Sequence, residues 1–141
     1  MSKLYICMST LILLLVFSVI SQAEPFTTLP SGLQYKDLQV GNGMKAKAGL
    51  TAVMHFTGWV DENGQQGKEI YNSRDEREPV SFVIGTDKVM QGWNEGVIGM
   101  RAGGKRLLRI PPELGYGDKA VEDVVPANAY LQFIIELLAV E

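Results

Sequence analysis

The chain has 141 residues and a mass of 15.5 kDa, which is the size of a single domain. Its formal net charge of −3 at pH 7 argues against nucleic acid as a partner, because proteins that bind a phosphate backbone normally carry a basic patch. One Cys and one His exclude an internal disulfide and an ordinary zinc site.

Residues 1–23 have the layout of a secretory signal peptide. A lysine near the start is followed by the mostly apolar stretch Leu11–Ile20, and small residues end at Ala23. We expect cleavage after Ala23, so that the mature protein is exported and makes no membrane contact. The alternative is retention as a membrane anchor, but Leu4–Ile20 falls short of the roughly 20 apolar residues that a spanning helix needs.

The mature chain would contain no cysteine, since Cys7 lies in the segment that is removed. A cysteine-free chain is compatible with an oxidising compartment. The chain ends in Val140-Glu141 without a tail for retention in the endoplasmic reticulum. We therefore expect a periplasmic or secreted protein, with the lumen of the endoplasmic reticulum as the alternative.

Residues 24–32, with two prolines, are expected to form an irregular lead, and residues 33–141 a folded domain. Alternating apolar residues predict mostly strands in that domain. The predicted strands are Leu33–Val40, Leu50–Val60, Gln65–Tyr71, Val80–Ile84, Lys105–Ile110 and Tyr130–Leu138. A change of phase at Asp37 indicates a β-bulge, and Asn63-Gly64 predicts a hairpin turn.

Lys88–Ile98 changes to helical spacing, with Trp93 on the apolar face. Gly92 and Gly96 are poor helix formers, so we expect only two or three turns. Their small size would also let a sheet approach closely. The chain thus predicts an α+β domain that combines an antiparallel sheet with one short helix.

Three motifs that would carry other chemistry fail on inspection. Gly99–Lys105 has the spacing of a phosphate loop, but it leads from a helix into a strand and Arg106 replaces the required Ser or Thr. His55 has no catalytic partners in the sequence, so we interpret it as a structural histidine. The acids of the charged loop Ser73–Pro79 alternate with arginines, which indicates a solvated surface rather than a cation site.

Aromatic residues from separate segments remain. Most aromatic side chains in a small domain build the core, and Phe82 and Phe133 lie in the middle of predicted strands. Trp93, on the short helix, and Tyr116, in the long loop Gly115–Asn128, are placed to face a ligand. An apolar pocket with few polar donors would bind an apolar group.

Six blocks of sequence, taken together, carry the strongest functional signal. They are Val53–Val60 (VMHFTGWV), Val89–Val97 (VMQGWNEGV), Gly99-Met100, Pro112–Gly117 (PELGYG), Val125-Pro126 and Leu131–Leu138 (LQFIIELL). In order and separation, over about Leu33–Glu141, these blocks resemble the FKBP family, the immunophilin peptidyl-prolyl cis-trans isomerases. The resemblance implies a twisted antiparallel β-sheet wrapped around one short α-helix. It also implies isomerisation of X-Pro bonds without a cofactor or metal.

The resemblance assigns roles in a proline pocket. Trp93 is similar to the floor beneath the proline ring, and the Tyr116 hydroxyl and the Met90 backbone N–H are similar to donors to substrate carbonyls. The implied catalytic residues are Tyr116, Trp93, Phe56 and Phe133, and the implied substrate-binding residues are Val89, Met90, Ile70, Tyr71, Val80 and Val125. Ile70 and Val80 stand where the family usually has Phe, so the rim should be smaller and less aromatic.

The chain departs from the family pattern at one polar pair. Tyr71 stands where the family has a pocket Asp, and Phe56 stands where it has the Tyr that lies within hydrogen-bond reach of that Asp. Because both polar partners are absent together, no buried orphan is left, and we expect a folded pocket with altered electrostatics. Glu76 stands where the family often has Arg, which bears on macrolide binding.

Two functions stay open. The first is a peptidyl-prolyl cis-trans isomerase that acts on X-Pro bonds of exported proteins. Its partners would be proline-containing peptide segments of client proteins and macrolides of the tacrolimus and rapamycin type. The second is a non-catalytic FKBP-like binding module or chaperone with an altered pocket. We expect a monomer, because no long helical extension lies between the signal peptide and the domain.

Overall fold

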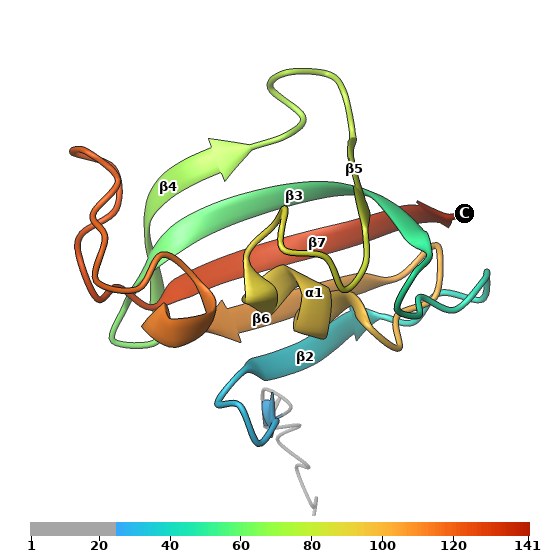
Figure 1. Cartoon of the computed structure of the whole chain (residues 1–141), viewed down its shortest axis with the longest axis horizontal. Helices are drawn as coiled ribbons and strands as arrows, with labels where there is room; N and C mark the ends of the chain where they lie inside the picture. Colours follow the sequence, from blue (N-terminus) through green and yellow to red (C-terminus); the bar gives the residue numbers. More distant parts are fainter. Residues whose placement is uncertain (1–24) are drawn as a thin grey trace, which may run out of the picture.

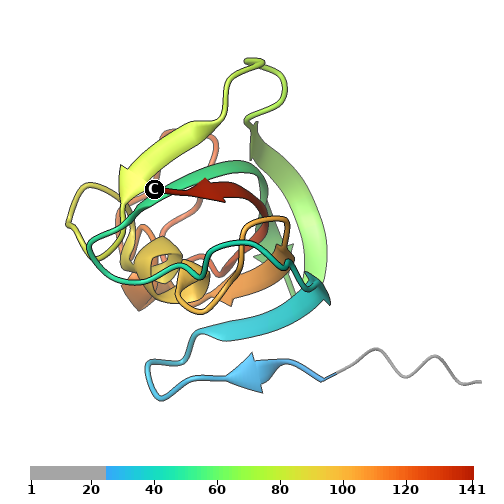
Figure 2. The same cartoon turned by 90° about the vertical axis from the view of Figure 1, so that its right-hand side faces the viewer.

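An antiparallel β-sheet curls around one short α-helix in residues 25–141, the part of the chain that the structure, a computed structural model, describes (Figure 1 and Figure 2). The strands are β1 (Thr27–Thr28), β2 (Gln34–Gln39), β3 (Thr51–Glu62), β4 (Gln65–Asn72), β5 (Val80–Val83), β6 (Lys105–Ile110) and β7 (Leu131–Val140), and the helices are α1 (Gln91–Val97) and a 3₁₀ turn (Pro112–Leu114). The predicted signal peptide, residues 1–23, lies outside the described residues. No helix within residues 25–141 is long and apolar enough to cross a membrane.

The strand order of the sheet is β1-β2-β6-β7-β3-β4, with every pairing antiparallel. The long strand β3 pairs with β7 along one edge, while its other edge pairs first with β5 and then with β4. The sheet bends so that α1 lies on its concave side (Figure 2). The predicted fold class, a twisted antiparallel sheet around one short helix, is confirmed.

The core lies between the sheet and α1. Every second residue of β3 from Ala52 to Val60 is buried, as the apolar alternation predicted. The same holds for β7, where the alternate residues from Leu131 to Leu137 are buried. Trp93 and Val97 of α1 pack into this surface.

The predicted turn and bulge are confirmed. Asn63 and Gly64 both have positive φ angles, 53° and 85°, which a two-residue type I′ hairpin turn requires. In β2 the pairing register shifts between Asp37 and Gln39, where the change of phase indicated a bulge. These local signals therefore set where the chain turns between β3 and β4 and where β2 changes register against β6.

The segment before β2 is less irregular than expected. Thr27 and Thr28 pair with Tyr35 and Gln34 of β2, and Leu33 is completely buried. A strand of two residues is too short to show an alternating pattern, so the sequence did not indicate it.

The helix is shorter than the predicted range Lys88–Ile98. Met90 has an extended backbone, with φ −59° and ψ 145°, and α1 begins after it. The Asn94 side chain accepts a hydrogen bond from the Gly85 N–H and donates one to the Thr86 carbonyl. These bonds hold the segment before Met90 in a loop, so helical spacing there does not become helix.

The two helix glycines allow the close approach that the sequence predicted. A β-carbon added at Gly92 would lie 2.7 Å from the side chain of Ile110, and one added at Gly96 would lie 2.5 Å from that of Leu108. Both partners lie on β6 and are fully buried. The absence of side chains at these positions therefore sets how deeply α1, and with it Trp93, sits on the sheet.

Arg106 holds the C-terminal end of α1, a role that the sequence did not indicate. Its buried guanidinium donates to the carbonyls of Gly96 and Ile98 at 3.0 and 3.1 Å, and it pairs with Asp37 of β2 at 2.7 Å. The last carbonyls of a helix have no partner within the helix. Arg106 satisfies two of them and ties α1 to β2 and β6.

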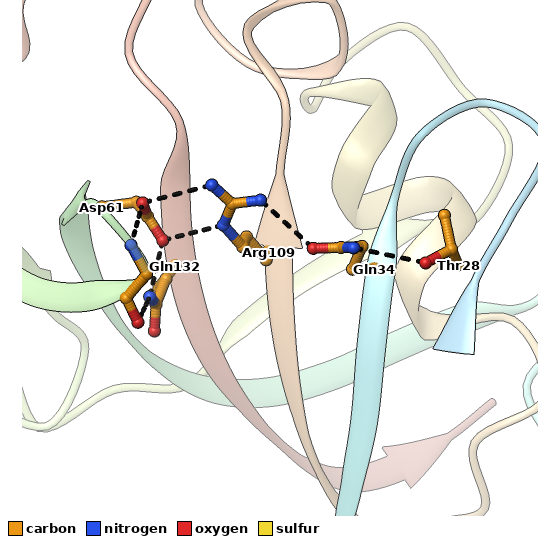
Figure 3. Close-up of polar contacts among 6 residues, drawn as sticks. Thr28, Gln34, Asp61, Arg109 and Gln132 are labelled. Atoms are coloured by element: carbon orange, nitrogen blue, oxygen red, sulfur yellow. Dashed lines mark hydrogen bonds and ion pairs between the residues drawn. The ribbon is translucent and has the colours of Figure 1, made fainter. Parts of the chain in front are cut away.

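A second arginine network, built on the partly buried Arg109, crosses the sheet next to the hairpin turn (Figure 3). The Asp61 side chain, only 2% exposed, accepts hydrogen bonds from Arg109 at 3.0 Å and from Gln132 at 2.7 Å. Arg109 also donates to Gln34, whose amide donates to Thr28 of β1. The network thus connects β3, β7, β6, β2 and β1 through side chains.

Replacing Asp61 by Asn should lower the free energy of unfolding by about 2–3 kcal/mol at pH 7, because Arg109 then loses its anion. Burial raises the pKa of the Asp61 carboxyl, but hydrogen bonds from Arg109, Gln132 and the Gly64 N–H outweigh burial and leave the pKa below its usual value. The ionised Asp61 carboxylate therefore contributes its full stabilisation above about pH 4, which is the pKa of an Asp in the unfolded chain. This contribution is lost as the pH falls through the pKa of Asp61 in the folded protein.

Urea unfolding of the wild type and of Asp61→Asn at pH 7 and at acidic pH measures this effect. The difference between the two proteins should narrow in acid, whereas an equal difference at both pH values would contradict the prediction. Asp75→Asn, in the exposed loop after β4, is the matched control. It should leave the free energy of unfolding unchanged at both pH values.

Candidate active site

A pocket of about 440 Å³ opens between the start of α1, strands β3 and β4, and the loop before β7. Its volume falls in the range of small-ligand sites, roughly 300–1,000 Å³. The lining residues are Phe56, Ile70, Tyr71, Lys88, Val89, Met90, Trp93, Tyr116, Val121, Val124, Val125 and Phe133. Lys88 is the one charged side chain among them, so the pocket is apolar with a cation at its edge.

Trp93 lies at the centre of an aromatic cluster in this pocket. Its ring centroid is 4.4 Å from that of Phe56 and 5.5 Å from that of Phe133, and both rings stand steeply to the indole, at 66° and 89°. Phe82 packs at 6.0 Å on another side. With 8% of its surface exposed, Trp93 is held rigidly from below and contributes the floor of the pocket.

The indole Nε1 of Trp93 is buried without a hydrogen-bond partner among the described residues. Leaving a buried donor unpaired costs about 1–3 kcal/mol, and native proteins retain few such groups. The unpaired N–H therefore lowers the stability of the fold, and the floor of the pocket nevertheless carries an indole rather than a purely apolar side chain.

Besides the buried indole N–H of Trp93, two hydrogen-bond donors at the pocket have no protein partner and remain free for a ligand. The Met90 backbone N–H, at the start of α1, donates to no protein group within residues 25–141. The hydroxyl of Tyr116, a residue 41% exposed in the loop after the 3₁₀ turn, likewise has no partner in that range. An apolar cup with two donors fits a ligand that carries carbonyl oxygens and an apolar ring.

Phe56 and Tyr71, the two residues that replace the polar pair of the family, form an aromatic stack. The two ring centroids lie 4.9 Å apart with an interplanar angle of 14°. A hydrogen bond to the Glu76 carboxylate, with a smaller contribution from burial, raises the pKa of the Tyr71 hydroxyl, a group that is uncharged at neutral pH in any case. The wall is therefore folded and uncharged, as expected from the joint absence of the polar pair.

His55 is a structural histidine, as predicted. Its Nδ1 lies 2.8 Å from the hydroxyl of the fully buried Ser73, which also accepts a hydrogen bond from the Phe56 N–H. This arrangement fixes the start of the charged loop Ser73–Pro79 beside the pocket.

Within residues 25–141 no group of acidic, histidine or cysteine side chains has the arrangement of a metal site.

The structure gathers all but one of the predicted site residues in one pocket. Tyr116, Trp93, Phe56, Phe133, Val89, Met90, Ile70, Tyr71 and Val125 line it. Val80, on β5, packs against the core and is absent from the lining. Lys88, Val121 and Val124 line the pocket but were not predicted. Lys88 and Val124 are sequence neighbours of Val89 and Val125, which was the one signal available, and Val121 had none.

Comparisons with known proteins agree with this geometry. The sequence model of a family described as "FKBP-type peptidyl-prolyl cis-trans isomerase" matches residues 42–138. An "FK506-binding protein" of Neisseria meningitidis serogroup B is 42% identical over 109 residues, which cover 77% of this chain and 96% of that protein. "FK506-binding protein 2" of Dictyostelium discoideum is 37% identical over 138 residues, 98% of each chain.

Two solved structures share the fold. The crystal structure of AtFKBP13 superposes with a TM-score of 0.73 at 36% sequence identity and covers 82% of this chain and 98% of its own. The crystal structure of FkpA from Escherichia coli gives a TM-score of 0.74 at 37% identity and covers 86% of this chain and 54% of its own.

Proposed function

The chain belongs to the FKBP-type peptidyl-prolyl cis-trans isomerases and is an enzyme of that type, and on this premise we propose that it isomerises X-Pro bonds of exported proteins in the pocket around Trp93. The observation that carries the proposal is the aromatic cup itself, with two free donors above an indole floor. Peptide segments that contain proline are its substrates.

The reaction needs no nucleophile, proton donor or metal. Rotation about an X-Pro bond is slow because the amide has partial double-bond character, with a barrier of about 18–20 kcal/mol. A catalyst must bind the twisted amide better than either planar form, and each tenfold gain in rate takes about 1.4 kcal/mol of such preference. An apolar cup supports this preference by removing water from the amide carbonyl, which weakens the resonance of the planar form.

Individual residues have distinct roles in this mechanism. The proline ring lies on Trp93 between Phe56 and Phe133, while the Met90 N–H and the Tyr116 hydroxyl donate to substrate carbonyls. Because none of these groups exchanges a proton, Tyr71 in place of an acid removes no proton-transfer group that the rotation requires, although it alters the electrostatics of the pocket. This argument favours catalysis over the alternative of a non-catalytic binding module.

The same pocket is proposed to take macrolides of the tacrolimus and rapamycin type; the names of two relatives describe those proteins as binding FK506. Tyr71 replaces the pocket Asp of the family and Glu76 replaces an Arg of opposite charge, so the bound macrolide would rely on apolar contacts with Trp93 and Phe56. Cleavage after Ala23 is proposed to release the enzyme into the periplasm or the medium. Mass spectrometry of the exported protein tests this, and a mature N-terminus away from Glu24 would contradict it.

An isomerase assay on a short prolyl peptide, coupled to a protease that cleaves one isomer, tests the activity. The purified chain without residues 1–23 should accelerate isomerisation, and a rate equal to the uncatalysed one would refute the proposal. Tyr116→Phe should lower kcat/KM by about three- to tenfold, because one hydrogen bond contributes about 0.5–1.5 kcal/mol. Tyr130→Phe is the matched control, since Tyr130 is equally exposed at 41% but contacts Arg109 outside the pocket.

A further inference from the structure

A second hollow lies beside the pocket, on the other side of Lys88 and Val89. It has a volume of about 360 Å³ and is lined by Thr51, Ser81, Phe82, Val83, Thr86, Lys88 and Val89. Lys88 and Val89 also line the pocket around Trp93. The two hollows therefore adjoin, with Lys88 and Val89 between them.

A side chain that lines the second hollow packs directly against the floor of the first. Phe82 lines the second hollow and packs against Trp93 with ring centroids 6.0 Å apart. Val83, 43% exposed, presents an apolar side chain to it. Lys88 is again the one charged lining residue. The surface suits an apolar side chain of a segment that already occupies the pocket.

Strand β5 gives this hollow a backbone edge. In the described sheet β5 pairs with β3 alone, and the loop that follows β5 runs away from the end of the strand toward α1 (Figure 1). The Thr86 hydroxyl donates to the Val83 carbonyl, so the end of the strand is already capped. An extended peptide can lie along such an edge, with main-chain contacts to the strand and alternate side chains in the hollow.

We propose that the second hollow is a secondary binding site for the client polypeptide, in which a segment with its proline on Trp93 crosses Val89 and places an apolar side chain against Phe82 and Val83. The proposal rests on the proposed function of the neighbouring pocket. Because this contact is remote from the rotating bond, it is equal in the ground state and in the transition state. Such binding lowers KM and leaves kcat unchanged.

Peptides of increasing length test the proposal on the chain without residues 1–23. One series extends a short prolyl peptide by up to six residues on the N-terminal side of proline, and the other on the C-terminal side, with a single Leu moved along an otherwise Gly/Ser extension. One series should show a position at which Leu lowers KM by about tenfold, because burying such a side chain stabilises by about 1.5 kcal/mol. If no position in either series lowers KM, the proposal is wrong.

Val83→Asp separates the second hollow from the pocket. The variant should keep the wild-type kcat/KM on the short peptide and lose the gain in KM that Leu provides in the extended one. Leu138→Asp is the matched control, since Leu138 lies on β7, is 42% exposed and is absent from the lining of both hollows. The control should retain the gain.

The outcomes distinguish failure of this site from failure of the pocket. If Val83→Asp lowers kcat/KM equally for short and extended peptides, Val83 acts through the fold and the secondary site is refuted. If it leaves the Leu gain intact, the client does not reach this hollow and the secondary site is again refuted. A wild type inactive on the short peptide refutes the proposed function instead.

Discussion

Replacing Trp93 by Leu should lower kcat/KM for isomerisation by about ten- to a hundredfold. The indole contacts Phe56 and Phe133 and forms the floor on which the proline ring rests. Burial of an aromatic surface of this kind contributes about 1.5–3 kcal/mol, and each 1.4 kcal/mol lost from transition-state binding is a factor of ten in rate. The protease-coupled assay on a short prolyl peptide measures the change.

The chain offers a matched control in its second tryptophan. Trp59 lies on β3 but faces away from the pocket between buried neighbours, so Trp59→Leu should retain full activity. It also leaves Trp93 as the sole indole, whose fluorescence then reports binding of a proline peptide or a macrolide. Trp93→Phe keeps an aromatic floor and should lose less activity than Trp93→Leu. An unchanged rate in Trp93→Leu would place catalysis elsewhere.

Replacing Gly96 by Ala should lower the free energy of unfolding by about 1–3 kcal/mol, which is the range for overpacking a filled core. Helix propensity acts in the opposite direction, since Ala is favoured over Gly by about 1 kcal/mol in a helix. The contact decides the sign, because the new β-carbon would lie 2.5 Å from the side chain of Leu108, which is fully buried. Relief requires α1 to move away from β6, which displaces Trp93 and lowers activity as well.

Equilibrium unfolding in urea measures this loss. Gly67→Ala is the control, because its added β-carbon would also meet an atom at 2.5 Å, but that atom belongs to the exposed side chain of Glu62, which can rotate away. The control should lose much less stability than Gly96→Ala. An equal loss in the two variants would show that packing of the helix on β6 is not the cause.

Local patterns predicted most of the elements. The alternation in β3 and β7, the Asn63-Gly64 turn and the bulge at Asp37 each follow from interactions within a few residues of chain, so a single sequence reveals them. The position of the helix was predicted correctly, but the predicted range was too long. The hydrogen bonds of the Asn94 side chain hold the preceding segment in a loop, and the periodicity of apolar residues does not reveal such bonds.

The residues of the candidate site also fall into two groups, those that the sequence predicted and those that depend on the path of the chain. The spacing of aromatic residues and the resemblance identified nine of the lining residues, whereas Lys88, Val121 and Val124 enter the pocket through the path of two loops. Loop paths depend on contacts between distant segments, which composition and spacing do not report. For the same reason Val80 was expected at the rim and lies against the core.

By itself, the sequence determined the fold class, the position of Trp93 on a short helix and the absence of a polar pair at Phe56 and Tyr71. Only the tertiary structure decided how that pair was replaced, by an uncharged aromatic stack, and how the helix is held, by the buried Arg106. It alone decided that a second hollow adjoins the pocket. Burial and distance between segments far apart in the chain arise only when the sheet closes around α1, whereas period and residue type are already present in the chain.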